Sequence, residues 1–195
     1  GRDCTVYCKR FDNYVESFDK HNSGGKADHM KVAGRIKNEI TIHSGYSVSI
    51  DTIGEGAGVY SRAVEICQES NGKLDEETII SCKYSEGAKT SSGKDLTDIT
   101  GQYTFANMRA YLFWAVRDWL NPDNNTGAML PPGGSFMEEA TEIKWSFLSN
   151  GKIIIEPKED IKERLGHSID EFDALANTFH PKAVEMTGVN ALPNY

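Results

Sequence analysis

The sequence predicts an α/β protein with a mixed β-sheet and helices on both faces of that sheet. Three observations support this prediction: an alternating hairpin near the start, a strand–helix–strand unit in the middle and a second hairpin near the end. Amphipathic helices separate these units. With 195 residues and no internal repeat, the chain is expected to form a single domain over residues 1–195.

The first half is expected to run strand, strand, helix, strand, helix. Polar and apolar residues alternate in the first two strands, which Phe11 and Asp12 join as a hairpin. The third strand is a short apolar run that ends at Asp51, and the glycine turn TIGEGAG follows it. The predicted elements are CTVYCKR (4–10), NYVESFDK (13–20), HMKVAGRIKNEI (29–40), YSVSID (46–51) and VYSRAVEICQES (59–70).

The second half is expected to begin with a strand and a long polar loop and to end in a hairpin and two helices. The central helix has a heavy aromatic face and ends before Asn121 and Pro122. An Asn-Gly pair marks the tip of the hairpin. The predicted elements are TIISCKY (78–84), a loop (85–102), FANMRAYLFWAVRDWL (105–120), EIKWSF (142–147), KIIIEP (152–157), EDIKERLG (159–166) and GHSIDEFDALANTF (166–179).

Composition excludes several classes of protein. The net charge of −8, from 21 Lys and Arg against 29 Asp and Glu, argues against a protein whose main task is to coat nucleic acid. It still allows an enzyme that holds DNA through one basic face. No apolar run approaches the ~18 residues that a membrane span needs. Four cysteines without a CxxC pair indicate reduced thiols of a cytoplasmic protein, not a structural zinc site.

Neither glycine-rich stretch matches a nucleotide-binding motif. In GEGAG (54–58), the third glycine of a dinucleotide-binding turn would fall on Val59. In GAKTSSGKD (87–95), five residues separate the glycines instead of four, and Asp95 stands where a P-loop has Ser or Thr. We therefore expect no ATP hydrolysis by this chain.

Two aspartates lie three residues apart at the start of the last predicted helix. Ser168 is expected to cap this helix, and Glu171 to complete a capping box. Asp170 falls in the first turn, where the helix dipole favours an anion by about 0.3–1 kcal/mol, so a surface charge explains it equally well. Asp173 lies at the rim of the apolar face, where a carboxylate is costly without a positive partner.

Asp51 lies at the carboxyl end of an apolar strand, where ligands of α/β sheets gather. A strand-end turn former explains Asp51 alone, but a strand-end aspartate and a helical Asp173 together are what a divalent cation requires. Hard oxygen ligands suit Mg²⁺ or Mn²⁺, and two such ions ~4 Å apart can clamp a phosphodiester. His167 is a candidate for orienting water or contacting a phosphate, although such histidines are more often surface residues.

Several motifs resemble the nuclease domain of large terminase subunits of tailed phages, which is related to RuvC-type resolvases. The run KWSFLSNGKIIIEPKEDIKERLGHSIDEFDALANTF is similar to the end of that domain, with its GKI hairpin, EPKEDIKKR segment and SPD-x-ADAL helix. FANMRAYLFWAVRDWL resembles the family's NKRAE-x-WW helix, and SIDTIGEGAGVYSRAVE its VDxxGxGAGVxDRL segment. The resemblance covers nearly the whole chain.

The resemblance implies an RNase H-like fold and a metal-dependent endonuclease that cuts concatemeric viral double-stranded DNA during genome packaging. It implies Asp51, Asp173 and Asp170 as ligands of Mg²⁺ or Mn²⁺ in a two-metal site, with Asp173 as the principal ligand. The expected partners are double-stranded DNA, the phage portal protein and the terminase small subunit, with no membrane. The expected location is the host bacterial cytoplasm, transiently at the procapsid portal.

The chain also departs from the family pattern. The family's first catalytic aspartate lies in a strand before the segment that GRDCTVY matches, so that strand and the ATPase domain are expected to precede Gly1. Ile169 and Phe172 replace a proline and an alanine without consequence for the chemistry. Two alternatives stay open: a junction resolvase or transposase nuclease on the same fold, and a non-catalytic module that docks on the portal or the small subunit.

Overall fold

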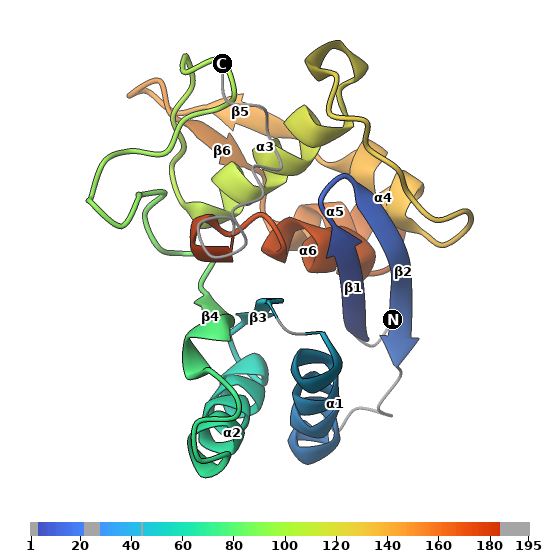
Figure 1. Cartoon of the computed structure of the whole chain (residues 1–195). Coiled ribbons are helices and arrows are strands. Elements are labelled where there is room, and N and C mark those ends of the chain that lie inside the picture. Colours follow the sequence, from blue (N-terminus) through green and yellow to red (C-terminus); the bar gives the residue numbers. More distant parts are fainter. Residues whose placement is uncertain (1–3, 22–27, 44, 184–195) are drawn as a thin grey trace.

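The computed structural model describes residues 4–21, 28–43 and 45–183, and the elements below belong to this part of the chain (Figure 1). The strands are β1 (Thr5–Phe11), β2 (Tyr14–His21), β3 (Val48–Asp51), β4 (Ile79–Cys82), β5 (Trp145–Phe147) and β6 (Ile153–Ile155). The α-helices are α1 (His29–Ile42), α2 (Gly56–Glu69), α3 (Met108–Leu120), α4 (Phe136–Glu142), α5 (Lys158–Leu165) and α6 (Asp170–Asn177).

The strands form three pairs. β1 and β2 are antiparallel, and so are β5 and β6, whereas β3 and β4 are parallel and joined through α2. Both predicted hairpins and the strand–helix–strand unit are therefore confirmed. Parallel and antiparallel pairs occur together, as predicted, but in the described residues β1 and β3 are not hydrogen-bonded to each other. The expected sheet is thus open between these two strands.

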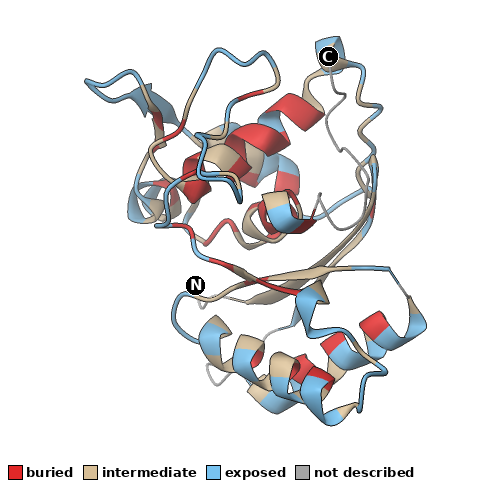
Figure 2. Cartoon of the chain, turned by 60° about the vertical axis from the view of Figure 1, so that its left-hand side comes forward, coloured by how far each residue is buried: buried red, intermediate tan, exposed pale blue. Residues whose placement is uncertain are grey.

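Helices cover the strands from two sides, as the sequence predicts (Figure 1). α1 and α2 lie on one side, where one apolar cluster contains Ile36, Ile50 and Val59. α3 and α6 lie on the other, in a larger cluster that includes the fully buried Trp119 and Leu175. Figure 2 shows the buried residues concentrated in these two layers. Within the described residues, no helix combines the length and apolar character needed to cross a membrane, and no disulfide links the four cysteines.

α2 begins at Gly56, three residues earlier than the sequence pattern indicates. A Cβ atom on Gly56 would lie 1.7 Å from the carbonyl oxygen of Asp51. Only glycine therefore lets the helix start directly against the end of β3. This close approach fixes the backbone at the carboxyl end of the strand, where Asp51 lies.

The start of α6 differs from the prediction, because Ser168 does not cap it. The N-cap residue is Ile169, and no side chain of the cap residue bonds to the helix. Instead, Glu139 of α4 accepts a hydrogen bond from the backbone N–H of Phe172 at 2.8 Å. Glu171 does not close a capping box but accepts from the N–H of Ser135 at 2.8 Å. The sequence pattern missed α4, and α4 supplies the partners that replace the local cap.

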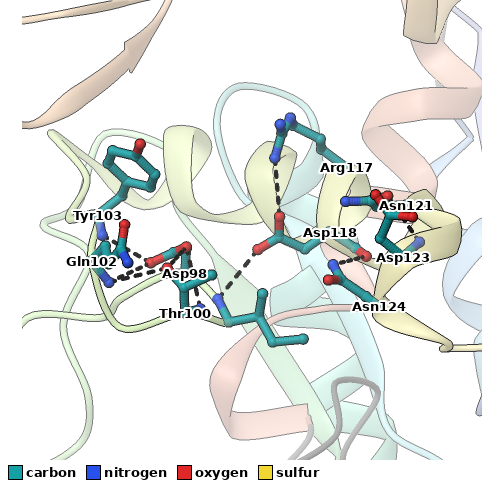
Figure 3. A network of polar contacts seen from close by, with 10 residues as sticks. Asp98, Thr100, Gln102, Tyr103, Arg117, Asp118, Asn121, Asp123 and Asn124 are labelled. Carbon is teal, nitrogen blue, oxygen red and sulfur yellow. Dashed lines mark hydrogen bonds and ion pairs between the residues drawn. The ribbon is translucent and has the colours of Figure 1, made fainter.

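Asp98 and Asp118 fix the end of the long loop to α3 (Figure 3). Asp98 accepts hydrogen bonds from the backbone N–H groups of Thr100, Gln102 and Tyr103 at 3.2, 2.9 and 2.8 Å. Asp118 of α3 accepts from the N–H of Ile99 at 3.3 Å. The two carboxylates therefore accept hydrogen bonds from four N–H groups of the loop, and Asp118 ties the loop to α3.

Candidate functional site

A cavity of about 1200 Å³ lies between β1, α1, β3 and α6. Asp51, Asp170 and Asp173 all line it, so three of the four residues predicted from the sequence lie around one space. The fourth, His167, is not among the residues that line this cavity. The three aspartates therefore come from the end of β3 and the first turn of α6.

Asp173 is largely buried, with 13% of its side chain exposed. Its Oδ2 atom lies 2.7 Å from the ammonium of Lys158, and the hydroxyl of Tyr84 donates to its backbone carbonyl at 3.2 Å and to Oδ1 at 3.4 Å. Burial raises the pKa of Asp173, and the negative charge of Asp51 raises it further, whereas Lys158 and Arg109 lower it. The net direction is upward, so this carboxylate is incompletely compensated.

Asp51 ends β3 with its side chain turned back on its own backbone. Its Oδ1 atom accepts a hydrogen bond from the N–H of Ile53 at 3.0 Å. Burial raises the pKa of Asp51, while the hydrogen bond from Ile53 and the charge of Lys158 lower it. Lys158 thus acts electrostatically on both Asp51 and Asp173, and the two carboxylates share this counter-charge.

Asp170 lines the same cavity but has a different partner. Its Oδ2 atom accepts a hydrogen bond from the backbone N–H of Cys4, just before β1, at 3.1 Å. This contact joins the start of α6 to the start of the hairpin. Asp170 therefore lies in the site and also holds two elements together.

His167 lies toward α4. Its Nδ1 atom contacts the carbonyl oxygen of Ser168 at 2.8 Å, and its Nε2 atom is 3.8 Å from a carboxylate oxygen of Glu138. The structure therefore does not bring His167 to the three aspartates.

Lys158, Tyr84 and Arg109 belong to the site and were not predicted from the sequence. Of these three residues, only Lys158 could have been noticed in the sequence. It is the first residue of α5, where a positive charge interacts unfavourably with the helix dipole. A cation in that unfavourable place indicates an anionic partner outside the helix. Tyr84 follows β4 and Arg109 lies in α3, and neither position differs from an ordinary structural one in the sequence.

The chemistry of the donors fits a divalent cation in part. Asp51 and Asp173, of which Asp51 raises the proton affinity of Asp173, offer hard oxygen ligands, which Mg²⁺ and Mn²⁺ prefer. Within the described residues, however, no group of three or more His, Cys, Asp or Glu side chains is arranged to hold a metal ion. Asp51 and Asp173 thus supply part of a coordination shell, and a complete one needs a further ligand.

Two unpaired strand edges face the cavity. β1 pairs only with β2, and β3 only with β4, among the described residues. All residues of both β1 and β3 line the cavity. The space between the strands therefore has an edge with unused backbone hydrogen-bonding groups on each side.

Comparison with known proteins identifies the fold. No protein-family model and no curated protein sequence matches the chain. Among solved structures, the nuclease domain of the large terminase subunit gp2 of bacterial virus Sf6 is similar, with a TM-score of 0.68 and 22% identity, covering 92% of this chain and 83% of that one. A lysine-to-alanine mutant of that domain with manganese has a TM-score of 0.67 and 21% identity, covering 90% of this chain and 82% of that one. The same mutant with calcium has a TM-score of 0.68 and 22% identity, covering 92% of this chain and 83% of that one. The likeness confirms the predicted RNase H-like fold.

Proposed function

We propose that this chain is the nuclease domain of a phage terminase large subunit, a metal-dependent endonuclease that cuts concatemeric viral double-stranded DNA during packaging. One observation carries the proposal: the strand-end Asp51 and the helical Asp173 line one cavity and share Lys158 as counter-charge. The fold likeness to a terminase nuclease domain and the sequence motifs support it.

Asp51 and Asp173 are the proposed principal ligands of Mg²⁺ or Mn²⁺, and Asp170 a secondary one. When bound, such a cation would activate water for attack and neutralise charge on the phosphodiester. Tyr84 holds the Asp173 carboxylate from one side through its hydroxyl. Lys158 compensates both carboxylates from the other side, which keeps Asp173 ionised more readily than burial alone would allow.

The cavity also offers positive groups for a phosphate backbone. Lys158 and Arg109 both line it, and both act electrostatically on Asp173. The Nη2 atom of Arg109 is buried and has no hydrogen-bond partner among the described residues. A phosphate oxygen is the kind of acceptor that this guanidinium lacks. The whole chain has a net charge of −8, which opposes DNA, so the binding of DNA by this chain should be weak and salt-sensitive.

A further ligand would come from an added strand. We propose that an extended segment fills the space between β1 and β3, hydrogen-bonds to both edges and carries a third acid to Asp51 and Asp173. The family resemblance suggests that this segment precedes Gly1 together with an ATPase domain. The terminase small subunit and the portal protein are the partners proposed for the whole assembly, in the host cytoplasm.

Nicking of supercoiled plasmid by the purified chain tests the proposal, with any natural sequence that precedes Gly1 included. We expect Mn²⁺-dependent nicking that EDTA abolishes and that the Asp51→Asn and Asp173→Asn variants lack. Asp95→Asn, an exposed aspartate outside the cavity, is the matched control and should retain activity. Nicking that persists in Asp173→Asn would contradict the proposal, and a strong preference for four-way junctions would favour a resolvase.

A further inference from the structure

A second cavity, of about 480 Å³, lies between α3, α4 and β5 and shares no lining residue with the aspartate cavity. Its walls are mainly apolar and include Trp114, Leu120, Ile143 and Trp145. We call it the aromatic groove. Its size lies within the ~300–1,000 Å³ that is usual for ligand sites.

Exposed aromatic rings surround the aromatic groove. All three residues of β5 are exposed, and Trp145 and Phe147 keep 44% and 52% of their surface in contact with solvent. Four rings form a closed set: the centroid distances are 5.8 Å for Tyr103–Trp114, 5.0 Å for Trp114–Trp145, 5.3 Å for Trp145–Phe147 and 5.9 Å for Phe147–Tyr103. Three of these rings, those of Tyr103, Trp145 and Phe147, are exposed to water beside the buried Trp114. Exposed rings held in place by one another are typical of an interaction surface.

The polar groups of the aromatic groove favour an anionic occupant. Arg117 is the charged residue of its lining, and its guanidinium lies 4.4 Å from the ring centre of Trp114. Its side chain is 54% exposed, with Nη1 3.2 Å from Asp118 (Figure 3). The Nε1 atom of Trp114 is buried and has no hydrogen-bond partner among the described residues. In a chain of net charge −8, the lining of this groove contains one cationic side chain and no carboxylate.

We infer that the aromatic groove binds a short acidic segment of a partner protein, which inserts one large apolar side chain and places a carboxylate against Arg117. The apolar walls, which include the exposed ring of Trp145, bind the inserted side chain. A single-stranded nucleic acid fits less well, because stacking platforms for bases run beside a track of several cations. This inference does not depend on the proposed nuclease activity, since the two cavities are separate.

Fluorine NMR of the intact chain tests this inference, because the chain has three tryptophans: Trp114, Trp119 and Trp145. With 5-fluorotryptophan incorporated, the chain is titrated with the blocked peptide EDFLDE. The matched probes are KKFLKK, EDSSDE and an oligothymidylate. We expect EDFLDE to shift the Trp145 and Trp114 signals saturably, and the fully buried Trp119 signal to stay unchanged. Binding of the three matched probes should be at least about tenfold weaker, since each lacks the charge, the apolar anchor or the peptide backbone.

Two variants complete the test. Trp145→Ala should lose the response of Trp114 to EDFLDE, and Arg117→Gln should weaken the affinity at least about fivefold when it and the wild type are compared at a temperature where both are folded. The inference is overturned if EDFLDE shifts neither signal, if KKFLKK binds equally well, or if Arg117→Gln binds as the wild type does. A stronger response to the oligothymidylate would replace the protein partner with a nucleic acid.

Discussion

Asp98 is buried and Asp173 is largely buried, yet the surroundings of these two aspartates differ in kind. Burial raises the pKa of Asp98, but hydrogen bonds from the Thr100 hydroxyl and from three backbone N–H groups outweigh it, so that its pKa is lowered. Asp173 receives an ammonium and a tyrosine hydroxyl, and burial raises its pKa despite them. A carboxylate with full backbone partners serves the fold, whereas one left short of partners retains capacity for a ligand.

The largest expected effect is on nicking activity, which should distinguish the metal-binding role of Asp173 from the structural role of Asp98. Asp173→Asn should lower Mn²⁺-dependent nicking about a thousandfold or more, because the bound cation contributes several kcal/mol and each ~1.4 kcal/mol is a factor of ten. Asp98→Asn should leave the activity of the folded protein within about twofold of the wild type. Plasmid nicking at a temperature where all proteins are folded measures both. Equal losses of nicking activity in the two variants would contradict the distinction between a metal ligand and a structural aspartate.

The second effect separates the two aspartates through stability. Asp98→Ala removes the acceptor of three loop N–H groups and of the Thr100 hydroxyl and should reduce the free energy of unfolding by about 1–2 kcal/mol. Asp173→Asn should leave the metal-free protein as stable as the wild type or slightly more stable, because a costly buried charge is removed. Urea denaturation monitored by tryptophan fluorescence gives both values. A large loss of stability in Asp173→Asn would make Asp173 a structural residue.

The Asp170→Asn variant should lose an intermediate amount of nicking activity, more than Asp98→Asn and less than Asp173→Asn. Because its carboxylate also bonds to the N–H of Cys4, Asp170→Asn is expected to reduce nicking about tenfold, the scale of a single ~1.4 kcal/mol contribution. Its asparagine retains an oxygen that can accept from Cys4, so stability should change little. If Asp170→Asn is as inactive as Asp173→Asn, the ranking of the two ligands is wrong.

The smallest effect is the dependence of stability on pH. The pKa of Asp173 is raised by folding, so the folded protein gains stability from this group as pH falls through the raised value. The pKa of Asp98 is lowered, so its contribution is present at neutral pH and lost as pH falls through the lowered value. Unfolding curves of Asp173→Asn and Asp98→Asn, compared with the wild type from pH 7 to below the ordinary aspartate pKa of ~3.9, should therefore diverge in opposite directions. The Asp173→Asn curve should diverge above that value and the Asp98→Asn curve below it. Parallel curves would contradict both assignments.

Apart from α4, the helices, the strands and the candidate aspartates could be identified from the sequence. The side chains that contact these aspartates and cap α6 could not. Asp51 and Asp173 could be singled out because strand ends and helix faces are local patterns. Lys158 bonds to a residue 15 positions away, and Glu139 caps a helix 33 positions away, so both contacts depend on tertiary packing. The Ser168 cap failed for the same reason, because a long-range acceptor replaced the local one. Periodicity does not contain such information.

Manganese binding tests the central claim most directly, and electron paramagnetic resonance measures the free ion in a titration of the chain. The wild type and the control Asp95→Asn should bind Mn²⁺ with equal affinity, and the affinity should weaken as pH falls, because protons compete for Asp51 and Asp173. Asp173→Asn should bind at least about tenfold more weakly, since it loses a charged ligand. Equal affinities of Asp173→Asn and the wild type would contradict the assignment of the cavity as a metal site.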